Sequence, residues 1–401
     1  MASTQYREID GRSGGFYALL GALGVLIVAG LAATWSMEHH GHVITGMNNR
    51  IVWGMPHVFA IFLIVAASGA LNVASIASVF GRELYKPLAR LSGLLALALL
   101  AGGLAVLVLD LGRPERLVVA MTHYNFKSIF AWNIFLYTGF FAIVALYLWT
   151  MFERRMNGHT GRVGLLAFFW RLVLTTGTGS ILGFLVARDA YNSALLAPLF
   201  IVMSFSFGLA IFVLVLMAAC RWTGRPLGDV MLARLKNLLG VFVGAVLYFV
   251  AIHHLTNLYI ARQHEVERFF LWDGGIYTAL FWFGQVLVGS LLPLTLLFIP
   301  ALNRSRRAVA AAAACVILGA LAQLYVLIIG GQAYPQLMFP DKHVSSSFFD
   351  GVVAAYTPSL PEVALGVGGV ALALALVAVA LKVLPFLPQS LADSDAKPDA
   401  A

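Results

Sequence analysis

The sequence Leu109-Asp110-Leu111-Gly112-Arg113-Pro114 ends one long apolar segment, and Asn125-Phe126-Lys127-Ser128 introduces the next, which contains Trp132. This stretch places a carboxylate, an arginine and the helix-stopping residues Gly and Pro where an apolar helix meets water. Charged groups close to lipid cost free energy unless they are paired or functional. We therefore interpret the stretch as one wall of a redox or proton-handling site at a membrane face.

Composition extends this interpretation to the whole chain. Of its 401 residues, 61% are hydrophobic and only 11% are charged, whereas a soluble domain is about half apolar and about a quarter charged. The apolar residues form runs of about twenty, each long enough to cross ~30 Å of hydrocarbon as a helix. We predict an all-α polytopic membrane protein. Its net charge of +8 then reflects arginines that hold loops on one side of the bilayer and does not indicate nucleic-acid binding. The ten predicted transmembrane helices cover approximately residues 15–36, 51–80, 91–111, 129–152, 164–187, 193–220, 236–260, 276–300, 308–330 and 362–384.

A weak internal repeat predicts how these spans are grouped. Trp132 and Gly139 in the fourth span share the spacing of Trp282 and Gly289 in the eighth span. An offset of four spans preserves the orientation of each helix, so we predict two parallel four-helix bundles and two flanking helices. The predicted units are a flanking span with its outer loop (1–50), the first bundle (51–190), the second bundle (191–330), an outer loop (331–361), a second flanking span (362–384) and a disordered cytoplasmic tail (385–401).

The distribution of basic residues predicts the orientation. With the N-terminus inside, 17 of the 26 Lys and Arg residues fall on the cytoplasmic side and 8 on the other, and Arg171 lies within a span. Cytoplasmic loops carry the excess of such residues. We predict that both termini are cytoplasmic in a bacterial inner membrane, that Asp110 and the loop 331–361 face outward, and that Arg171 snorkels to the inner surface.

Ionisable side chains gather near the outer ends of the spans, and three of them have two interpretations each. His57 could hydrogen-bond a quinone carbonyl and exchange a proton, or it could simply bond a backbone carbonyl at the interface. Asp110 could accept a proton in a quinol site, or pair with Arg113 to fix the helix end. Tyr137 could donate to the same ligand, or pack as an ordinary aromatic residue.

Other cofactors receive little support from the sequence. Cys220 and Cys315 are too few for a four-thiolate iron–sulfur cluster, and no haem-attachment motif is present. A b-type haem held by His57 and either His253 or His254 stays open as an alternative, because it needs imidazoles from two facing helices. The run from Glu38 to His42 resembles a metal site, but we interpret it as a solvated loop.

The motif Asp110-Leu111-Gly112-Arg113-Pro114, followed by Asn125-Phe126-Lys127-Ser128 and Trp132, resembles the hallmark of the NrfD/PsrC family of polysulfide reductase membrane subunits. The runs Gly330-Gly331-Gln332-Ala333-Tyr334-Pro335 and Arg188-Asp189-Ala190-Tyr191-Asn192-Ser193 are similar to its ten-span branch, which includes the hydrogenase-2 membrane subunit and, as our preferred match, DsrP. The resemblance implies a menaquinone or ubiquinone as bound substrate, no intrinsic haem or iron–sulfur cluster, and a periplasmic ferredoxin-like iron–sulfur subunit as partner.

The resemblance also implies a site. Family members place a histidine, an asparagine and a tyrosine at the quinone, which carries over to His57 and Tyr137, but no asparagine stands beside His57. Asp110 and Arg113 match the motif directly. The quinone site predicted from the motif and the spans together is His57, Asp110, Tyr137, Arg113 and Trp132.

We therefore predict a quinone- or quinol-interacting membrane subunit of a respiratory or sulfur-metabolising redox complex, without catalytic activity on its own. A partner would rest on loops 112–128, 261–275 and 331–361, whose residues His123, Tyr124, Trp272, Tyr334 and Phe339 suit a wet interface. The alternatives are a secondary transporter, a passive anchor of the complex and a b-type cytochrome subunit.

Overall fold

The computed structural model describes residues 4–302, 305–336 and 351–395. Within these ranges, ten helical segments are long and apolar enough to cross a membrane, which confirms the predicted all-α polytopic fold. The principal elements are α1 (Gly14–His40), α2 (Met55–Ala70), α3 (Asn72–Ser78), α4 (Ala89–Leu109), α6 (Ile129–Phe152), α7 (Thr160–Gly183), α8 (Leu196–Thr223), α9 (Asp229–Tyr259), α11 (Ile276–Ala279), η7 (Leu280–Leu291), α12 (Leu292–Phe298), α13 (Arg306–Tyr325), η8 (Val326–Gly330) and α15 (Leu360–Val383).

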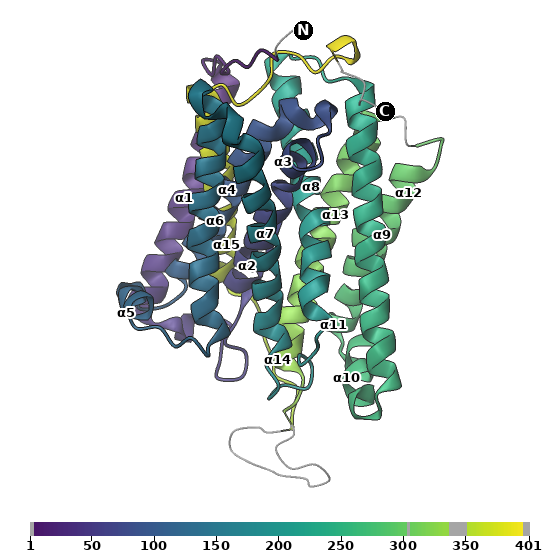
Figure 1. The fold of residues 1–401 in the computed structure, drawn as a ribbon. Coiled ribbons are helices and arrows are strands. Elements are labelled where there is room, and N and C mark those ends of the chain that lie inside the picture. Colours follow the sequence, from purple (N-terminus) through teal and green to yellow (C-terminus); the bar gives the residue numbers. More distant parts are fainter. Residues whose placement is uncertain (1–3, 303–304, 337–350, 396–401) are drawn as a thin grey trace.

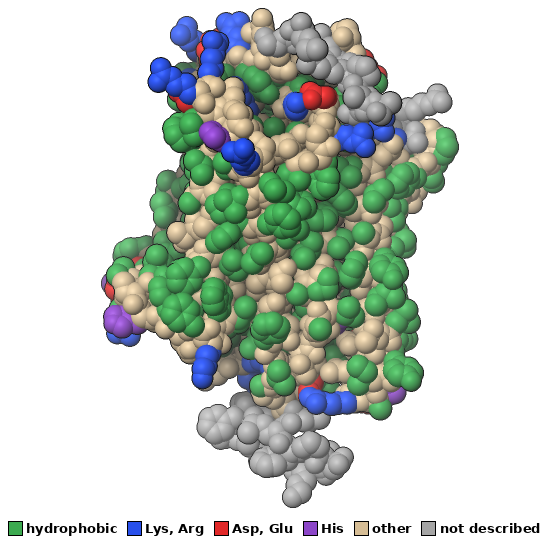
Figure 2. All heavy atoms as spheres, viewed as in Figure 1, with side chains coloured by type: hydrophobic (Ala, Val, Ile, Leu, Met, Phe, Trp, Pro, Cys, Tyr) green, Lys and Arg blue, Asp and Glu red, His purple; other side chains and the backbone are tan. Residues whose placement is uncertain are grey.

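The bundle has two chemically different faces. Both termini lie at one face, which we call the terminal face, and α5 (Leu117–Thr122), α10 (His264–Arg268) and α14 (Gly331–Ala333) lie at the opposite, distal face (Figure 1). Lys and Arg side chains gather mainly around the terminal face, and a belt of hydrophobic side chains lies between the two faces (Figure 2). Lipid would cover this belt.

Helix α8 occupies the centre of the bundle, where it packs against α2 and α7 on one side and against α9 and α13 on the other. Glycines permit its contact with α2, because a Cβ on Gly208 would lie 2.1 Å from the Ala70 nitrogen. Membrane helices commonly approach through such small residues. Since α8 contacts helices of both predicted bundles, the division at residues 190/191 stays a prediction. Helices α1 and α15 pack on each other, and α15 also packs on α2 and α4.

The second predicted span is two helices, because the chain interrupts its hydrogen bonding at Leu71, between α2 and α3. Ser92 of α4 repairs the interruption: its hydroxyl donates to the Ala70 carbonyl at 2.6 Å and accepts from the Ala74 amide at 3.0 Å. Backbone groups in a membrane interior need such internal partners. The break turns Asn72 toward α7, where its side chain meets Arg171.

Arg171 does not snorkel, so that prediction was wrong. Its side chain is completely buried, and its Nη2 donates to the Asn72 side-chain oxygen at 2.9 Å. The guanidinium also lies 4.9 Å from the ring centre of Phe168 and 5.0 Å from that of Phe205. These aromatic faces and the break after α2 give the cation favourable contacts inside the bundle, so it does not reach for water.

The two halves of the proposed repeat share local geometry. The Trp132 indole donates to the Phe126 carbonyl at 2.9 Å, and the Trp282 indole donates to the Leu271 carbonyl at 2.9 Å. Each tryptophan therefore bonds the start of its helix to the preceding chain, which is a turn at Phe126 and a short π-helical segment at Leu271. Gly289 packs on Gly319 of α13, while Gly139 packs on Trp170 of α7.

The segment after α15 corrects the prediction of a disordered tail over 385–401, as far as residue 395. Phe386 and Leu387 are buried, and Arg225 Nη1 donates to the Leu387 carbonyl at 2.8 Å. The segment also forms isolated backbone bridges with Tyr6 and Leu227. Residues 396–401 lie outside the described part of the chain.

Candidate functional site

The motif residue Asp110 lies where α4 ends at the distal face. It caps the helix, with its amide bonded to the Val106 carbonyl at 3.1 Å. Gly112 then turns the chain with a φ of +68°, and a Cβ at this position would lie 2.9 Å from the His42 ring. Glycine is therefore required both for the left-handed turn and for the close approach of His42. The motif thus builds a helix end against which an imidazole can pack.

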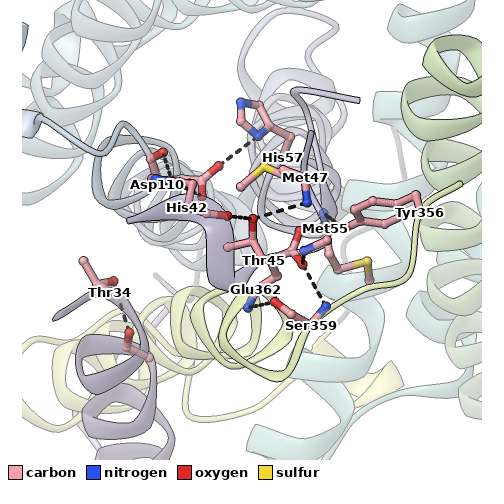
Figure 3. Close-up of polar contacts among 12 residues, drawn as sticks. Thr34, His42, Thr45, Met47, Met55, His57, Asp110, Tyr356, Ser359 and Glu362 are labelled. Carbon is pink, nitrogen blue, oxygen red and sulfur yellow. Dashed lines mark hydrogen bonds and ion pairs between the residues drawn. The ribbon is translucent and has the colours of Figure 1, made fainter. Parts of the chain in front are cut away.

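Two histidines flank the Asp110 carboxylate (Figure 3). His57, in the first turn of α2, brings its Nδ1 to 3.0 Å from Oδ2, and His42, from the loop after α1, brings its Nε2 to 3.7 Å from Oδ1. His42 Nε2 also lies 3.2 Å from the Asp110 backbone oxygen. The carboxylate is only 1% exposed, against 20% for His57 and 33% for His42. The three groups thus form a short series in which the most buried group, Asp110, lies between two partly exposed histidines.

The electrostatics of the series favour charged groups. Burial is the strongest influence on Asp110 and raises the pKa of its carboxyl, but close contacts with His42 and His57 together bring this pKa below its usual value. Contact with Asp110 raises the pKa of His42, against the smaller effect of its partial burial. An ionised carboxylate beside an imidazole that readily holds a proton is a suitable arrangement for proton transfer.

The series retains unused hydrogen-bonding capacity. The contact between His57 Nδ1 and Asp110 Oδ2 has the distance of an ion pair but not the direction of a good hydrogen bond, and these buried atoms have no other partner in the described residues. The second ring nitrogen of His57 points away from Asp110 (Figure 3). Buried polar atoms in proteins usually have a hydrogen-bond partner. The His57 ring nitrogens and the Asp110 carboxylate oxygens therefore suit a polar ligand group or water as a further partner.

A buried glutamate holds the backbone around the histidines. Glu362, in the first turn of α15, is fully buried and accepts hydrogen bonds from the Gly46 amide at 2.9 Å, the Ser359 amide at 2.7 Å and the Tyr356 hydroxyl at 2.7 Å. The Tyr356 hydroxyl in turn accepts from the Met55 amide at 2.7 Å. Glu362 therefore fixes the loop that follows His42 and the start of the helix that carries His57 (Figure 3).

A second set of contacts fixes Trp53 beside His57. The Gln332 side-chain oxygen accepts from the amides of Val52 and Trp53 at 3.0 and 3.1 Å, and Arg188 donates to the Gln332 carbonyl at 3.0 Å. The Trp53 ring stacks near His57, with their centres 6.2 Å apart. The two runs associated with the ten-span branch thus support the His57 end of the site.

The structure brings together only part of the predicted quinone site. His57 and Asp110 are in contact, and the paired alternative for Asp110 uses histidines and not Arg113, which is exposed in the loop after α4. The Tyr137 hydroxyl has Thr178 of α7 as its hydrogen-bond partner, and the Trp132 indole bonds the Phe126 carbonyl. In the described residues, no hydrogen bond, ion pair or ring contact joins Tyr137, Arg113 or Trp132 to the pair.

Sequence reasoning missed His42 and Glu362. We interpreted His42 as part of a solvated histidine run, and its role depends on a loop returning to the end of α4. Glu362 carried a visible signal, because Ser359 and Glu362 have the spacing of a capping box and form one. That spacing predicts a helix start but not the contact with Gly46.

Comparison with known proteins relates this chain to membrane subunits of redox enzymes. The family described as "Polysulphide reductase, NrfD" matches residues 43–336. The Hdr-like menaquinol oxidoreductase integral membrane subunit of Archaeoglobus fulgidus is 29% identical, over 96% of this chain and 98% of its own length. A putative dimethyl sulfoxide reductase membrane subunit of Halobacterium salinarum is 27% identical over 95% and 92%. A polysulfide reductase chain of Wolinella succinogenes is 24% identical over 71% and 96%.

Proposed function

The chain belongs to the polysulphide reductase NrfD family, and from this premise we propose that it is the quinone- or quinol-interacting membrane subunit of a redox complex. The observation that carries the proposal is the buried Asp110 carboxylate between His57 and His42 at the distal end of the bundle. The name of one relative, a menaquinol oxidoreductase subunit, supports a quinone as substrate, and that of another, a polysulfide reductase chain, supports a place in respiratory or sulfur metabolism. The choice between menaquinone and ubiquinone stays a prediction. Assignment to the DsrP branch stays a prediction.

His57 is the residue that we expect to contact the quinone headgroup. Its Nδ1 is directed to Asp110, so its other ring nitrogen can hydrogen-bond a headgroup oxygen. Trp53, held by Gln332, provides an aromatic wall beside the imidazole. A bound quinone supplies the two-electron chemistry, and the protein positions it and handles the protons. Tyr137, Arg113 and Trp132 stay predicted contacts of the ligand.

The three groups offer a route for a proton that ends at His42, the most exposed of them. A proton accepted at His57 can be released from Nδ1 toward the Asp110 carboxylate, and His42, on the other carboxylate oxygen, is the group nearest to distal water. Asp110, in contact with Nδ1, therefore holds the orientation of the His57 ring and lies where it can receive the proton that His57 releases. His42 completes the route to the solvent.

The partner of the chain is proposed from its distal loops. We expect a periplasmic ferredoxin-like iron–sulfur subunit to contact loops 112–128, 261–275 and 331–361. Trp272 is 65% exposed, and His123 is also exposed, which leaves both free for such a contact. Phe339 and the rest of 337–350 lie outside the described residues. The orientation that follows has both termini in the cytoplasm and the protein in the bacterial inner membrane.

Quinone binding to the full-length chain in lipid nanodiscs tests the proposal. We expect His57→Ala to raise the Kd of a short-chain menaquinone or ubiquinone analogue at least about tenfold, because a buried acceptor left without its hydrogen-bond partner costs about 1–3 kcal/mol. His123→Ala, an exposed histidine of the same face, is the matched control and should leave the Kd unchanged. Equal affinity of the wild type and His57→Ala would overturn the site.

The same variants separate the alternatives. A passive anchor predicts that quinone-linked turnover of the assembled complex survives His57→Ala, whereas our proposal predicts its loss with assembly intact. A b-type cytochrome predicts a Soret band in the purified chain. A secondary transporter predicts solute uptake by proteoliposomes that contain the chain alone.

A further inference from the structure

The second half of the bundle contains another buried carboxylate–imidazole pair, which the proposed quinone function does not use. Glu267 on α10 accepts at Oε2 from His254 Nδ1 of α9 at 2.6 Å and at Oε1 from the Asn257 amide at 2.8 Å. The Glu267 side chain is 1% exposed and that of His254 is 16% exposed. The pair lies at the distal face, as the Asp110 pair does, but in the other predicted bundle.

A cavity of about 40 Å³ adjoins this pair. Its distal wall includes His253, His254 and Glu267, and its deeper wall includes Gln285 and Gln323. A buried water needs roughly 10–15 Å³, so the cavity has room for about three waters, while a quinone ring would need several times that volume. Size and polarity together identify water as the occupant that fits.

The polar lining continues toward the middle of the membrane. A second cavity of about 10 Å³ is lined by the same Gln285 and Gln323, together with Ser206 and Ser290. Ser206 stands ten residues after Leu196, the distal end of α8, which is about 15 Å at 1.5 Å per residue and about half of the hydrocarbon thickness. The two cavities therefore trace a route from Glu267 to about mid-membrane.

Both glutamines need partners that the protein does not provide. Gln285 is 7% exposed and Gln323 is 5% exposed, and neither side-chain amide hydrogen-bonds another residue in the described ranges, although both line the cavities. Buried amides are normally satisfied by protein or water. Gln285 also lies in η7, a π-helical segment, and Gln323 lies just before η8, another one. π-Helical segments are rare in proteins as a whole, and those that occur are often found at functional sites.

We propose that these residues form a hydrated proton-exchange site, in which the Glu267–His254 pair exchanges protons with distal water and waters held by Gln285 and Gln323 extend the route to mid-membrane. When bulk hydronium gives up a proton to the pair and leaves as water, the Glu267 carboxylate becomes a carboxylic acid and the net charge of the pair rises by one. The other ionisable group that lines the cavity is His253 on α9. Along the chain next to Glu267, Arg262 and Arg268 form ion pairs of their own, with Asp189 and Asp273.

The proton at Glu267 is tested by infrared spectroscopy of the full-length chain in nanodiscs. We expect a protonated-carboxyl band that grows on acidification. In D₂O the band should already be shifted in the first spectrum recorded, because its proton exchanges with water. The band should be absent from Glu267→Gln, a variant that keeps the shape of the side chain. Quinone affinity at His57 should be unchanged in this variant, which separates the inference from the proposed function. Two results would overturn the proposal. In one, Glu267→Gln removes no pH-dependent carboxyl band from the spectrum; in the other, the proton of that band exchanges with D₂O only over hours.

The deeper route is tested with a small thiol probe. In a Cys220→Ala, Cys315→Ala background, Ser206→Cys should react with aqueous Ag⁺ at least about ten times faster than Leu318→Cys, which lies on α13 and is 59% exposed on the lipid-facing surface. Gln323→Met, which removes the amide at nearly equal volume, should slow the reaction of Ser206→Cys. If Ser206→Cys is no more reactive than Leu318→Cys in folded protein, the route is dry and the inference fails.

Discussion

At the scale of single residues, the site depends on one carboxylate with two unequal neighbours. Asp110 is almost completely buried, His57 is largely buried and His42 is a third exposed. The motif predicted the carboxylate, and the position of His57 near the outer end of the second span predicted the first histidine. It could not predict His42, since the contact joins residues 68 positions apart.

The pH dependence of stability follows from these pKa shifts. Contact with Asp110 raises the pKa of His42, so its contribution to stability is fully present below the unfolded value of about 6.5 and is lost as the pH rises through the folded pKa. The effect should be about 0.5 kcal/mol, because the imidazole is partly exposed. Thermal unfolding of the detergent-solubilised chain between pH 6 and 9 measures it. His42→Gln should flatten the profile, and an unchanged profile in this variant would contradict the assignment.

At the scale of elements, glycine contacts and a helix break set the positions of the helices that carry the site. Helix α2 carries His57 and touches α8 where Gly69 meets Ser204 and Gly208 meets Ala70. The break at Leu71 leaves α2 and α3 as separate helices, and the Ser92 hydroxyl joins them through hydrogen bonds to the backbone of both. Composition showed the apolar span but not the break, because Gly69 alone does not predict an interruption at Leu71 and the compensating serine comes from another helix.

Gly208→Leu should separate α2 from α8. Even a Cβ at this position would lie 2.1 Å from a backbone nitrogen that cannot move aside cheaply, and overpacking of this kind costs about 1–3 kcal/mol or more. We expect a lower unfolding temperature and weaker quinone binding, because His57 begins α2. Gly244→Leu is the matched control, since nothing lies within 4 Å of a Cβ at this position on α9. Equal destabilisation by the two substitutions would show that the crossing is not tightly packed.

At the scale of the whole molecule, the two faces differ in charge and in chemistry. Basic residues gather at the terminal face (Figure 2), while the carboxylate–imidazole pairs of Asp110 and Glu267 both lie at the distal face. A complex that exchanges electrons at one side of a membrane would place its partner over the distal loops. The indole-to-carbonyl bonds of Trp132 and Trp282 are a feature that the two predicted bundles share, and the repeat itself stays a prediction.

The orientation can be checked with fusions to the intact protein. A fluorescent protein at the C-terminus should fold and fluoresce in the cytoplasm, and a cysteine at Trp272 in the cysteine-free background should react with a membrane-impermeant reagent added outside the cells. Both results follow from the excess of Lys and Arg at the terminal face. Labelling of Trp272→Cys only after the inner membrane is permeabilised would reverse the proposed topology.

The sequence by itself determined the class of the protein, because ten apolar runs admit few structures other than a helical bundle in a membrane. Its charge bias determined which loops share a face, and its motif determined where a carboxylate meets water. Only the tertiary structure decided which side chains share that carboxylate, that Arg171 is enclosed by aromatic rings, and that Glu267 and His254 pair beside a cavity. The physical reason is that hydropathy and turn chemistry act locally along the chain, whereas ion pairs, buried amides and cavities arise where helices distant in sequence pack together.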